Sequence, residues 1–275
     1  MKRFGLLIIG DEILSGKRCD KHLAKVIELL GKRGLSLSWA HYVGDDRAAI
    51  AALLTQSFAS DDVVFSTGGI GATPDDHTRQ AAAAALGVDV VLHPEAERLI
   101  ASRIAKMNAA IERPVPITDA EHRQRMRMGE FPVGAEIIPN PYNEIPGFMV
   151  REHYFVPGFP VMAWPMLEWV LDTRYVHLFD RSRNAERSML VFETAESKLT
   201  PLMERIETDF EGIKVFSLPS VGGSPEEGGA DGARSRRHIE LGVKGSQTRI
   251  TDAYRALEAG VIALGAPFTA VESER

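Results

Sequence analysis

Short apolar runs alternate with amphipathic segments along the first part of the chain. Residues 4–9 and 63–65 are continuously apolar, as in buried strands, and residues 35–43 alternate well enough to form another strand. Apolar side chains recur at helical spacing over residues 20–32 and 50–58, which lie between these strands. This order predicts an α/β fold with a three-layer, doubly wound, mostly parallel sheet, whose ligands bind beyond the carboxyl ends of the strands.

A polar link near residues 180–186 predicts a domain boundary. The strand-like and helix-like segments beyond it follow a different order, which indicates a small α+β domain. Residues 219–235 lack apolar periodicity and predict a flexible loop within that domain. The expected divisions are therefore a first domain at residues 1–180, a small domain at residues 181–266 and a tail at residues 267–275.

A glycine-rich turn follows the apolar run at residues 63–65. Residues 68–71 let the backbone turn sharply, and Pro74 with Asp75, Asp76 and Thr78 resembles a helix start. Backbone N–H groups in such a turn bind phosphate, yet two carboxylates at the same place would repel it. A divalent metal ion between the carboxylates and the phosphate would resolve this conflict. The alternative, in which Asp75 or Asp76 only caps the helix, stays open at this point.

Acidic residues also follow the other predicted strands. Residues 10–12 end the first apolar run and Asp45 follows the second, so we expect all these carboxylates at one edge of the sheet. The helical, mixed-charge residues 89–129 would form an insertion beside this edge, and its basic run at residues 122–127 either reaches a phosphate or forms a solvated helix face. The expected metal ligands are Asp45, Asp75 and Asp76. The expected catalytic residues are these three and Glu12, and the expected ligand-binding residues are Gly10, Asp11, Thr67, Gly68, Gly69, Gly71, Thr73 and Thr78.

Composition excludes several classes of function. The chain has 275 residues, 44% hydrophobic and 25% charged, which is enough to bury a substantial core. Its net charge of -6 gives no general electrostatic reason to bind nucleic acid or an anionic membrane, and no segment is long enough to span a bilayer. The single cysteine, Cys19, cannot form an internal disulfide, and no zinc-binding spacing is present. We therefore expect a cytoplasmic protein.

Several motifs together resemble one family, the MoaB/Mog (molybdopterin-binding-like) domain family. The chain looks most like the amino-terminal part of the competence/damage-inducible protein A (CinA) group, and it also resembles the equivalent domain of eukaryotic FAD synthases. The resemblance covers about residues 1–175 and implies that Asn140, Pro157 and Gly158 also lie in site loops. The motifs follow in the family's order at residues 10–16, 43–47, 67–78, 132–141, 146–148 and 155–160.

The chain also departs from the family's pattern. The family usually has Asp-x-Asn where this chain has Asp20, Lys21 and His22, so the role of the asparagine amide is not carried over. It usually has proline where this chain has Ala72, which should loosen the loop. In CinA-like proteins a small KH-type domain follows, and commonly an amidase domain after it. We expect the KH-like domain here but no amidase, because the sequence ends at Arg275.

Three functions are compatible with these residues. The resemblance implies a metal-dependent nucleotide pyrophosphatase that acts on ADP-ribose, FAD or a similar dinucleotide diphosphate with Mg, Mn, Co or Ni. Whether a monovalent cation takes part is left open. A metal-activated water would attack phosphorus, and Glu12 or Asp11 would be the base. The alternatives are molybdopterin binding or adenylylation in molybdenum cofactor biosynthesis, and a non-catalytic nucleotide sensor.

The small domain also bears on assembly. It has few residues with which to bury a core alone, and its sheet needs covering. MoaB/Mog domains are usually oligomeric, so the resemblance points the same way. We therefore expect a homodimer or a higher homo-oligomer.

Overall fold

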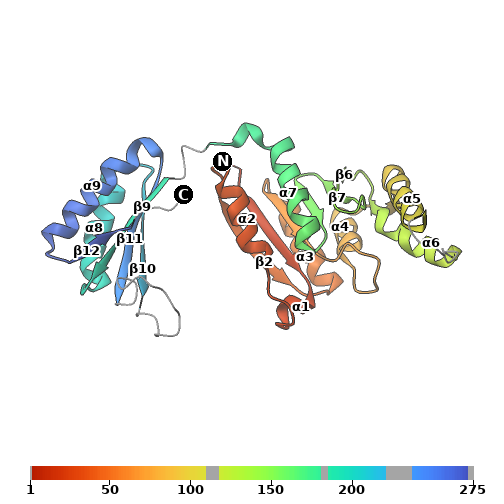
Figure 1. Ribbon diagram of the computed structural model, residues 1–275, viewed down its shortest axis with the longest axis horizontal. Helices are drawn as coiled ribbons and strands as arrows, with labels where there is room; N and C mark the ends of the chain where they lie inside the picture. Colours follow the sequence, from red (N-terminus) through yellow and green to blue (C-terminus); the bar gives the residue numbers. More distant parts are fainter. Residues whose placement is uncertain (1, 110–117, 181–184, 221–236, 272–275) are drawn as a thin grey trace. The chain divides into compact units, whose positions relative to one another are not determined.

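The structure is a computed structural model that describes residues 2–109, 118–180, 185–220 and 237–271 (Figure 1). Its internal contacts divide the chain into two compact units. The first unit comprises Met1–Lys32 and Ser36–Phe179, and the second comprises Arg33–Leu35 and Asp180–Arg275. None of the helices in the described part of the chain has the length and apolar character that crossing a membrane requires.

The first unit is built on a six-stranded sheet. Its strands are β1 (Phe4–Ile9), β2 (Leu37–Val43), β3 (Val63–Thr67), β6 (Glu136–Ile138), β7 (Gly147–Val150) and β8 (His153–Val156). They lie in the order β2-β1-β3-β8-β7-β6, in which the first four are parallel, β7 pairs antiparallel with β8, and β6 pairs antiparallel with β7. Every residue of β1 and β3 is buried, as in strands that are covered on both faces.

Helices cover both faces of this sheet (Figure 1). The main ones are α2 (His22–Gly31), α3 (Arg47–Phe58), α4 (Thr78–Leu86) and α7 (Pro160–Arg174). Helix α2 contacts α7, and α3 contacts α4. Leu7 and Ile9 of β1 belong to the same core cluster as Ile50 and Leu54 of α3, so alternate residues of β1 face one helical layer. The predicted three-layer α/β fold with a mostly parallel sheet is therefore confirmed.

A two-stranded antiparallel sheet and two helices form the expected insertion. Its elements are β4 (Val90–Leu92), α5 (Pro94–Ala109), α6 (Asp119–Met126), the 3-10 turn η1 (Arg127–Gly129) and β5 (Glu130–Pro132). Strands β4 and β5 pair antiparallel, and α5 contacts α6. A capping box between Thr118 and Glu121 begins α6. This small sheet was not predicted, because its two strands have only three residues each and show no periodicity.

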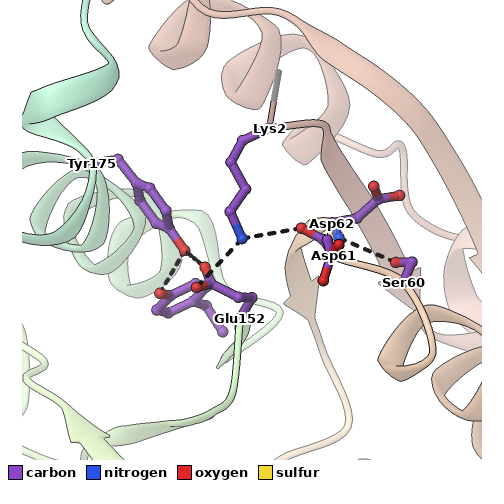
Figure 2. Close-up of polar contacts among 7 residues, drawn as sticks. Lys2, Ser60, Asp61, Asp62, Glu152 and Tyr175 are labelled. Carbon is purple, nitrogen blue, oxygen red and sulfur yellow. Dashed lines mark hydrogen bonds and ion pairs between the residues drawn. The ribbon is translucent and has the colours of Figure 1, made fainter.

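Polar side chains gather at the amino ends of β1, β3 and β8 (Figure 2). The Lys2 Nζ donates to the Asp61 carbonyl oxygen at 3.2 Å and lies 3.6 Å from the Glu152 carboxylate. The Glu152 carboxylate accepts the hydroxyl of Tyr175, which in turn lies 2.7 Å from the Tyr154 hydroxyl. These groups are partners of one another and tie together the segments that lead into the three strands.

The second unit is a small α+β domain. Its elements are β9 (Ala185–Phe192), α8 (Glu196–Asp209), β10 (Lys214–Ser220), β11 (His238–Gly245), α9 (Gln247–Ala263) and β12 (Phe268–Ala270). The four strands form an antiparallel sheet in the order β10-β11-β9-β12. Met189, Val191, Leu241 and Val243 alternate along their strands toward the core that α8 and α9 complete.

Two expectations about this domain need correction. The tail expected at residues 267–275 contains β12, because Phe268 packs against the core and the strand pairs with β9. The loop expected at residues 219–235 begins too early, since residues 219–220 pair with β11 as the end of β10. The remainder of that loop, residues 221–235, lies outside the described residues.

Candidate functional site

A cavity of about 390 Å³ lies at the carboxyl ends of β1, β3 and β8. Small-molecule sites in open α/β sheets occur at this edge, and this volume falls within their usual range. The structure brings most of the predicted site residues together in its lining, where they come from five separate segments. The predicted residues in the lining are Gly10, Glu12, Asp45, Gly68, Gly69, Gly71, Thr73, Asp75, Asp76, Asn140, Pro157 and Gly158.

The glycines after β3 allow three chain segments to meet. Gly68 has φ +100°, and a Cβ there would lie 2.2 Å from the Ile9 carbonyl oxygen at the end of β1. A Cβ at Gly158, just after β8, would lie 3.4 Å from the Cα of Gly68. The Gly68 N–H donates to the Val156 carbonyl oxygen at 3.0 Å. The loop is therefore pressed between the ends of its two neighbouring strands.

Asp76 closes this loop with both carboxylate oxygens. Its Oδ1 accepts the Gly71 N–H at 2.8 Å, and its Oδ2 accepts the Thr73 N–H at 2.8 Å and the Thr73 hydroxyl. Helix α4 begins at Thr78, with His77 as its N-cap, so of the residues expected at the helix start only Thr78 lies in the helix. The carboxylate turns back toward the glycines instead of capping α4, because it satisfies N–H groups of the preceding turn.

The first turn of α4 holds the glycine loop through hydrogen bonds to its carbonyl oxygens. The Thr78 hydroxyl donates to the Gly68 carbonyl oxygen at 3.0 Å, and the Thr78 N–H donates to the Gly69 carbonyl oxygen at 3.0 Å. Arg79 donates from Nη2 to the Gly71 carbonyl oxygen, and burial lowers the pKa of its guanidinium. Thr67 and Thr78, which were predicted to bind the ligand, are buried and do not line the cavity. Thr78 positions the loop, and Thr67 belongs to β3.

Asp11 and Asp45 lock the ends of β1 and β2 together. The Asp11 N–H donates to Asp45 Oδ2 at 2.9 Å, and the Asp45 N–H donates to Asp11 Oδ1 at 3.1 Å. Burial raises the pKa of Asp45, and the nearby carboxylates of Asp11, Glu12 and Asp75 add to the rise. Asp11 itself borders a shallower groove next to the cavity. The carboxylates thus concentrate negative charge along one wall.

The residues present fit a divalent metal ion only in part. Within the described ranges, no three His, Cys, Asp or Glu side chains are grouped so that they could hold a metal ion by themselves. The expected ligand set of Asp45, Asp75 and Asp76 is therefore not preassembled, since Asp76 is engaged by the loop. Magnesium is usually held by one or two carboxylates, with waters and substrate phosphates completing its shell. Asp45 and Asp75 fit that arrangement.

Two polar residues near the cavity, His22 and Asn140, hydrogen-bond to the backbone of the site loops. His22 is 4% exposed, and its Nε2 lies 3.0 Å from the Gly158 carbonyl oxygen, so this residue ties α2 to the loop after β8. Asn140 donates from Nδ2 to Asn143 Oδ1 at 2.8 Å and to the Ile145 carbonyl oxygen at 2.9 Å. Its amide is therefore occupied within its own loop, although the residue lines the cavity.

The cavity also contains residues that sequence reasoning missed. Phe159 stood within a family motif but was not singled out, and Arg18 and Met128 gave no recognisable signal. Gln124 of α6 donates to the Ala72 carbonyl oxygen, so the insertion contacts the glycine loop as expected. The additional lining residues are Ile9, Arg18, Ile70, Ala72, Met128, Asn143, Ile145, Pro146, Phe159 and Met162.

Two proteins described as CinA-like are similar in sequence to about three quarters of this chain. A CinA-like protein from Citrifermentans bemidjiense is 33% identical over 206 residues, which cover 74% of this chain and 47% of that protein. Another, from Anaeromyxobacter sp. (strain Fw109-5), is 32% identical over 216 residues, which cover 76% of this chain and 50% of that protein. The chain thus spans about half the length of these relatives.

Structural comparison supports the fold. The crystal structure of the protein CinA with unknown function from Thermoplasma acidophilum has a TM-score of 0.53 at 24% identity, and the match covers 62% of this chain and 98% of that one. Residues 5–176 match the family model described as "Probable molybdopterin binding domain". The chain therefore belongs to the MoaB/Mog-like family of molybdopterin-binding-type domains and is a CinA-like member of it.

Proposed function

We propose that this protein is a metal-dependent nucleotide pyrophosphatase that acts on ADP-ribose, FAD or a similar dinucleotide diphosphate. One observation carries the proposal: the glycine loop and the carboxylates of Asp45, Asp75 and Asp76 border the same cavity. The loop supplies N–H donors for a diphosphate, and the carboxylates supply charge for a cation that bridges to it.

The loop N–H groups already hold an anion, the Asp76 carboxylate. A diphosphate that accepts the Gly71 and Thr73 N–H groups would replace that carboxylate and release it toward the cavity. Asp76 would then join Asp45 and Asp75 on the acidic wall. When bound there, a divalent ion supplies charge neutralisation and a bound water of lowered pKa. Asp76 does not cap helix α4 in this mechanism, because the N-cap residue is His77.

Glu12 is the better candidate for the general base. It lines the cavity, and its carboxylate passes so close to Gly10 that a Cβ there would lie 2.6 Å from it. Asp11 Oδ1 instead accepts the Asp45 N–H, and its side chain borders the neighbouring groove. Glu12 is therefore the carboxylate that could take a proton from an attacking water inside the cavity.

The test is a panel of ADP-ribose, FAD and NADH assayed with magnesium, manganese, cobalt and nickel. We expect hydrolysis of at least one diphosphate only when a divalent metal is present. Turnover that persists in EDTA would contradict the metal-dependent mechanism.

Molybdopterin binding is the second candidate, and the family match favours it because the family model is described by that ligand. The pterin would use the same cavity, with its phosphate at the glycine loop. Molybdopterin binding at micromolar concentration, without turnover of any diphosphate, would replace the pyrophosphatase proposal. Nucleotide binding without turnover would support the sensor.

We also propose that the protein is a homodimer or a higher homo-oligomer. The expectation that the small domain could not bury a core alone was wrong, because α8 and α9 complete one core with its sheet. The proposal therefore rests on the resemblance to a family whose domains are usually oligomeric. Light scattering at micromolar protein tests this directly. A mass near 30.2 kDa, that of one chain, would contradict it.

A further inference from the structure

A flat aromatic side chain stands at the cavity wall on a fixed backbone. Phe159 lines the cavity while 52% of its surface is exposed. Its carbonyl oxygen accepts the N–H groups of Met162 and Ala163 at 2.9 Å, which anchors it as the N-cap of α7. The carbonyl oxygen of the preceding residue, Gly158, lies 3.0 Å from His22 Nε2. The backbone that carries the exposed ring is therefore anchored on both sides.

Arg18 lies over this ring. Its guanidinium carbon is 5.9 Å from the ring centroid, within the range of a cation–π contact, and Arg18 lines the same cavity. The Arg18 N–H donates to the Glu12 carbonyl oxygen at 2.9 Å, so its backbone is tied to the turn after β1. Aromatic rings and planar guanidinium groups both stack on heteroaromatic rings.

We propose that Phe159 and Arg18 form a platform on which the heteroaromatic ring of a nucleoside diphosphate stacks. The inference deepens the proposed function and rests on it for the position of the diphosphate at the glycine loop. The path between the two is short, because Gly158 packs against Gly68 and is followed directly by Phe159. Stacking on such a platform tolerates different rings, which suits a substrate class that includes both adenine and flavin groups.

The test compares two probes that share a diphosphate. ADP and inorganic pyrophosphate are titrated calorimetrically into the full chain with magnesium present, for the wild type, Phe159→Leu and Arg18→Gln. Val161→Ala is the matched control, because Val161 is also 52% exposed near the start of α7 but does not line the cavity. We expect Phe159→Leu to weaken ADP binding at least about fivefold and to leave pyrophosphate binding unchanged. Arg18→Gln should weaken ADP more than pyrophosphate, and Val161→Ala should affect neither.

Three results would overturn the platform. They are unchanged ADP affinity in Phe159→Leu, an equal loss for ADP and pyrophosphate, and no ADP binding by the wild type. A change in the molecular mass of Phe159→Leu with unchanged ADP affinity would instead assign the ring to a protein contact. Failure of the pyrophosphatase proposal looks different, because ADP would then bind and respond to Phe159→Leu while no diphosphate is hydrolysed.

Discussion

The two ends of the six-stranded sheet carry similar residues in different arrangements. Both have carboxylates, and a second cavity of about 380 Å³, lined by Arg3, Trp39, His41 and Asp62 among others, is as large as the candidate site. There the Asp62 carboxylate accepts the Trp39 Nε1–H at 2.8 Å and lies 3.7 Å from Arg3. Cavity size and acidic residues therefore do not identify the site by themselves.

Backbone geometry separates the two ends. At the carboxyl end, glycines with positive φ press the loop against β1 and β8, and the loop N–H groups meet an anion. At the amino end, Glu152 forms an ion pair with Lys2 and accepts the Tyr175 hydroxyl (Figure 2). The carboxylates at the carboxyl end of the parallel strands thus border the candidate cavity and a glycine loop, whereas Glu152 and Asp62 at the amino end pair with neighbouring side chains.

The largest expected effect comes from Gly68→Ala. The new Cβ would lie 2.2 Å from the Ile9 carbonyl oxygen at φ +100°, so we expect a loss of about 3 kcal/mol in the free energy of unfolding. Gly16→Ala is the control, because Gly16 also has positive φ but no atom lies within 4 Å of its Cβ position. It should cost only about 1 kcal/mol. Urea unfolding measures both, and equal losses would show that the packing at Gly68 is unimportant.

Asp76→Asn should show that a carboxylate at the carboxyl end of the sheet affects turnover, whereas one at the amino end does not. One amide oxygen cannot accept all three hydrogen bonds that Asp76 now accepts, so we expect a loss of about 1–2 kcal/mol in stability. Turnover of a diphosphate should fall at least about a hundredfold. Asp62→Asn, at the other end, keeps an acceptor for Trp39 and should leave turnover unchanged. Near-normal turnover in Asp76→Asn would remove this residue from the mechanism.

Acid pH should lower the free energy of unfolding through His153, which lies at the amino end of β8. This residue begins β8, packs against Phe58 and lies with Nε2 2.8 Å from the Ser57 hydroxyl. Burial lowers the pKa of His153 to about 3. The unfolded chain takes up this proton near pH 6.5 and the folded chain does not, so stability falls as pH drops below that value.

Between pH 7 and pH 5 this histidine alone should cost about 2 kcal/mol. Chemical denaturation of the wild type and His153→Gln at both pH values measures it. The glutamine variant should lose less stability than the wild type over this interval. Parallel pH profiles would show that His153 takes up its proton in the folded state as well.

The smallest effect is expected for Lys2→Met. The ion pair of Lys2 with Glu152 is 3.6 Å long and partly exposed, so its loss should cost less than about 0.5 kcal/mol. Diphosphate turnover should not change. A drop in turnover would show that the amino end of the sheet influences the site, and the distinction between the two ends would fail.

Much of the fold could be predicted from periodicity. Residues 4–9 coincide with β1, and the apolar run that begins at Val63 marks β3, because strands buried on both faces have continuous apolar runs. Strands β4, β5 and β12 have three residues each, which is too short for a pattern. Strands β4 and β5 pair only with each other, and β12 adds to the edge of β9, so all three depend on tertiary contacts.

The site was less predictable than the fold. The glycine loop and the acidic residues after β1 and β2 could be located, because strand order alone places them at one edge of the sheet. The role of Asp76 depends on a carboxylate that turns back on its own loop, and no spacing rule indicates that. Arg18 and Phe159 are distant in sequence and meet only when the loops after β1 and β8 come together. Such pairs follow from tertiary structure, not from local patterns.

The most direct test of the central claim is the metal dependence of ADP-ribose hydrolysis in the wild type and Asp75→Asn. Asp75 is exposed at the cavity, so the substitution should leave urea unfolding unchanged. We predict that wild-type hydrolysis requires a divalent metal, and that Asp75→Asn lowers kcat at least about a hundredfold and raises the metal concentration needed. Hydrolysis that continues in EDTA, or normal turnover in Asp75→Asn, would contradict the account.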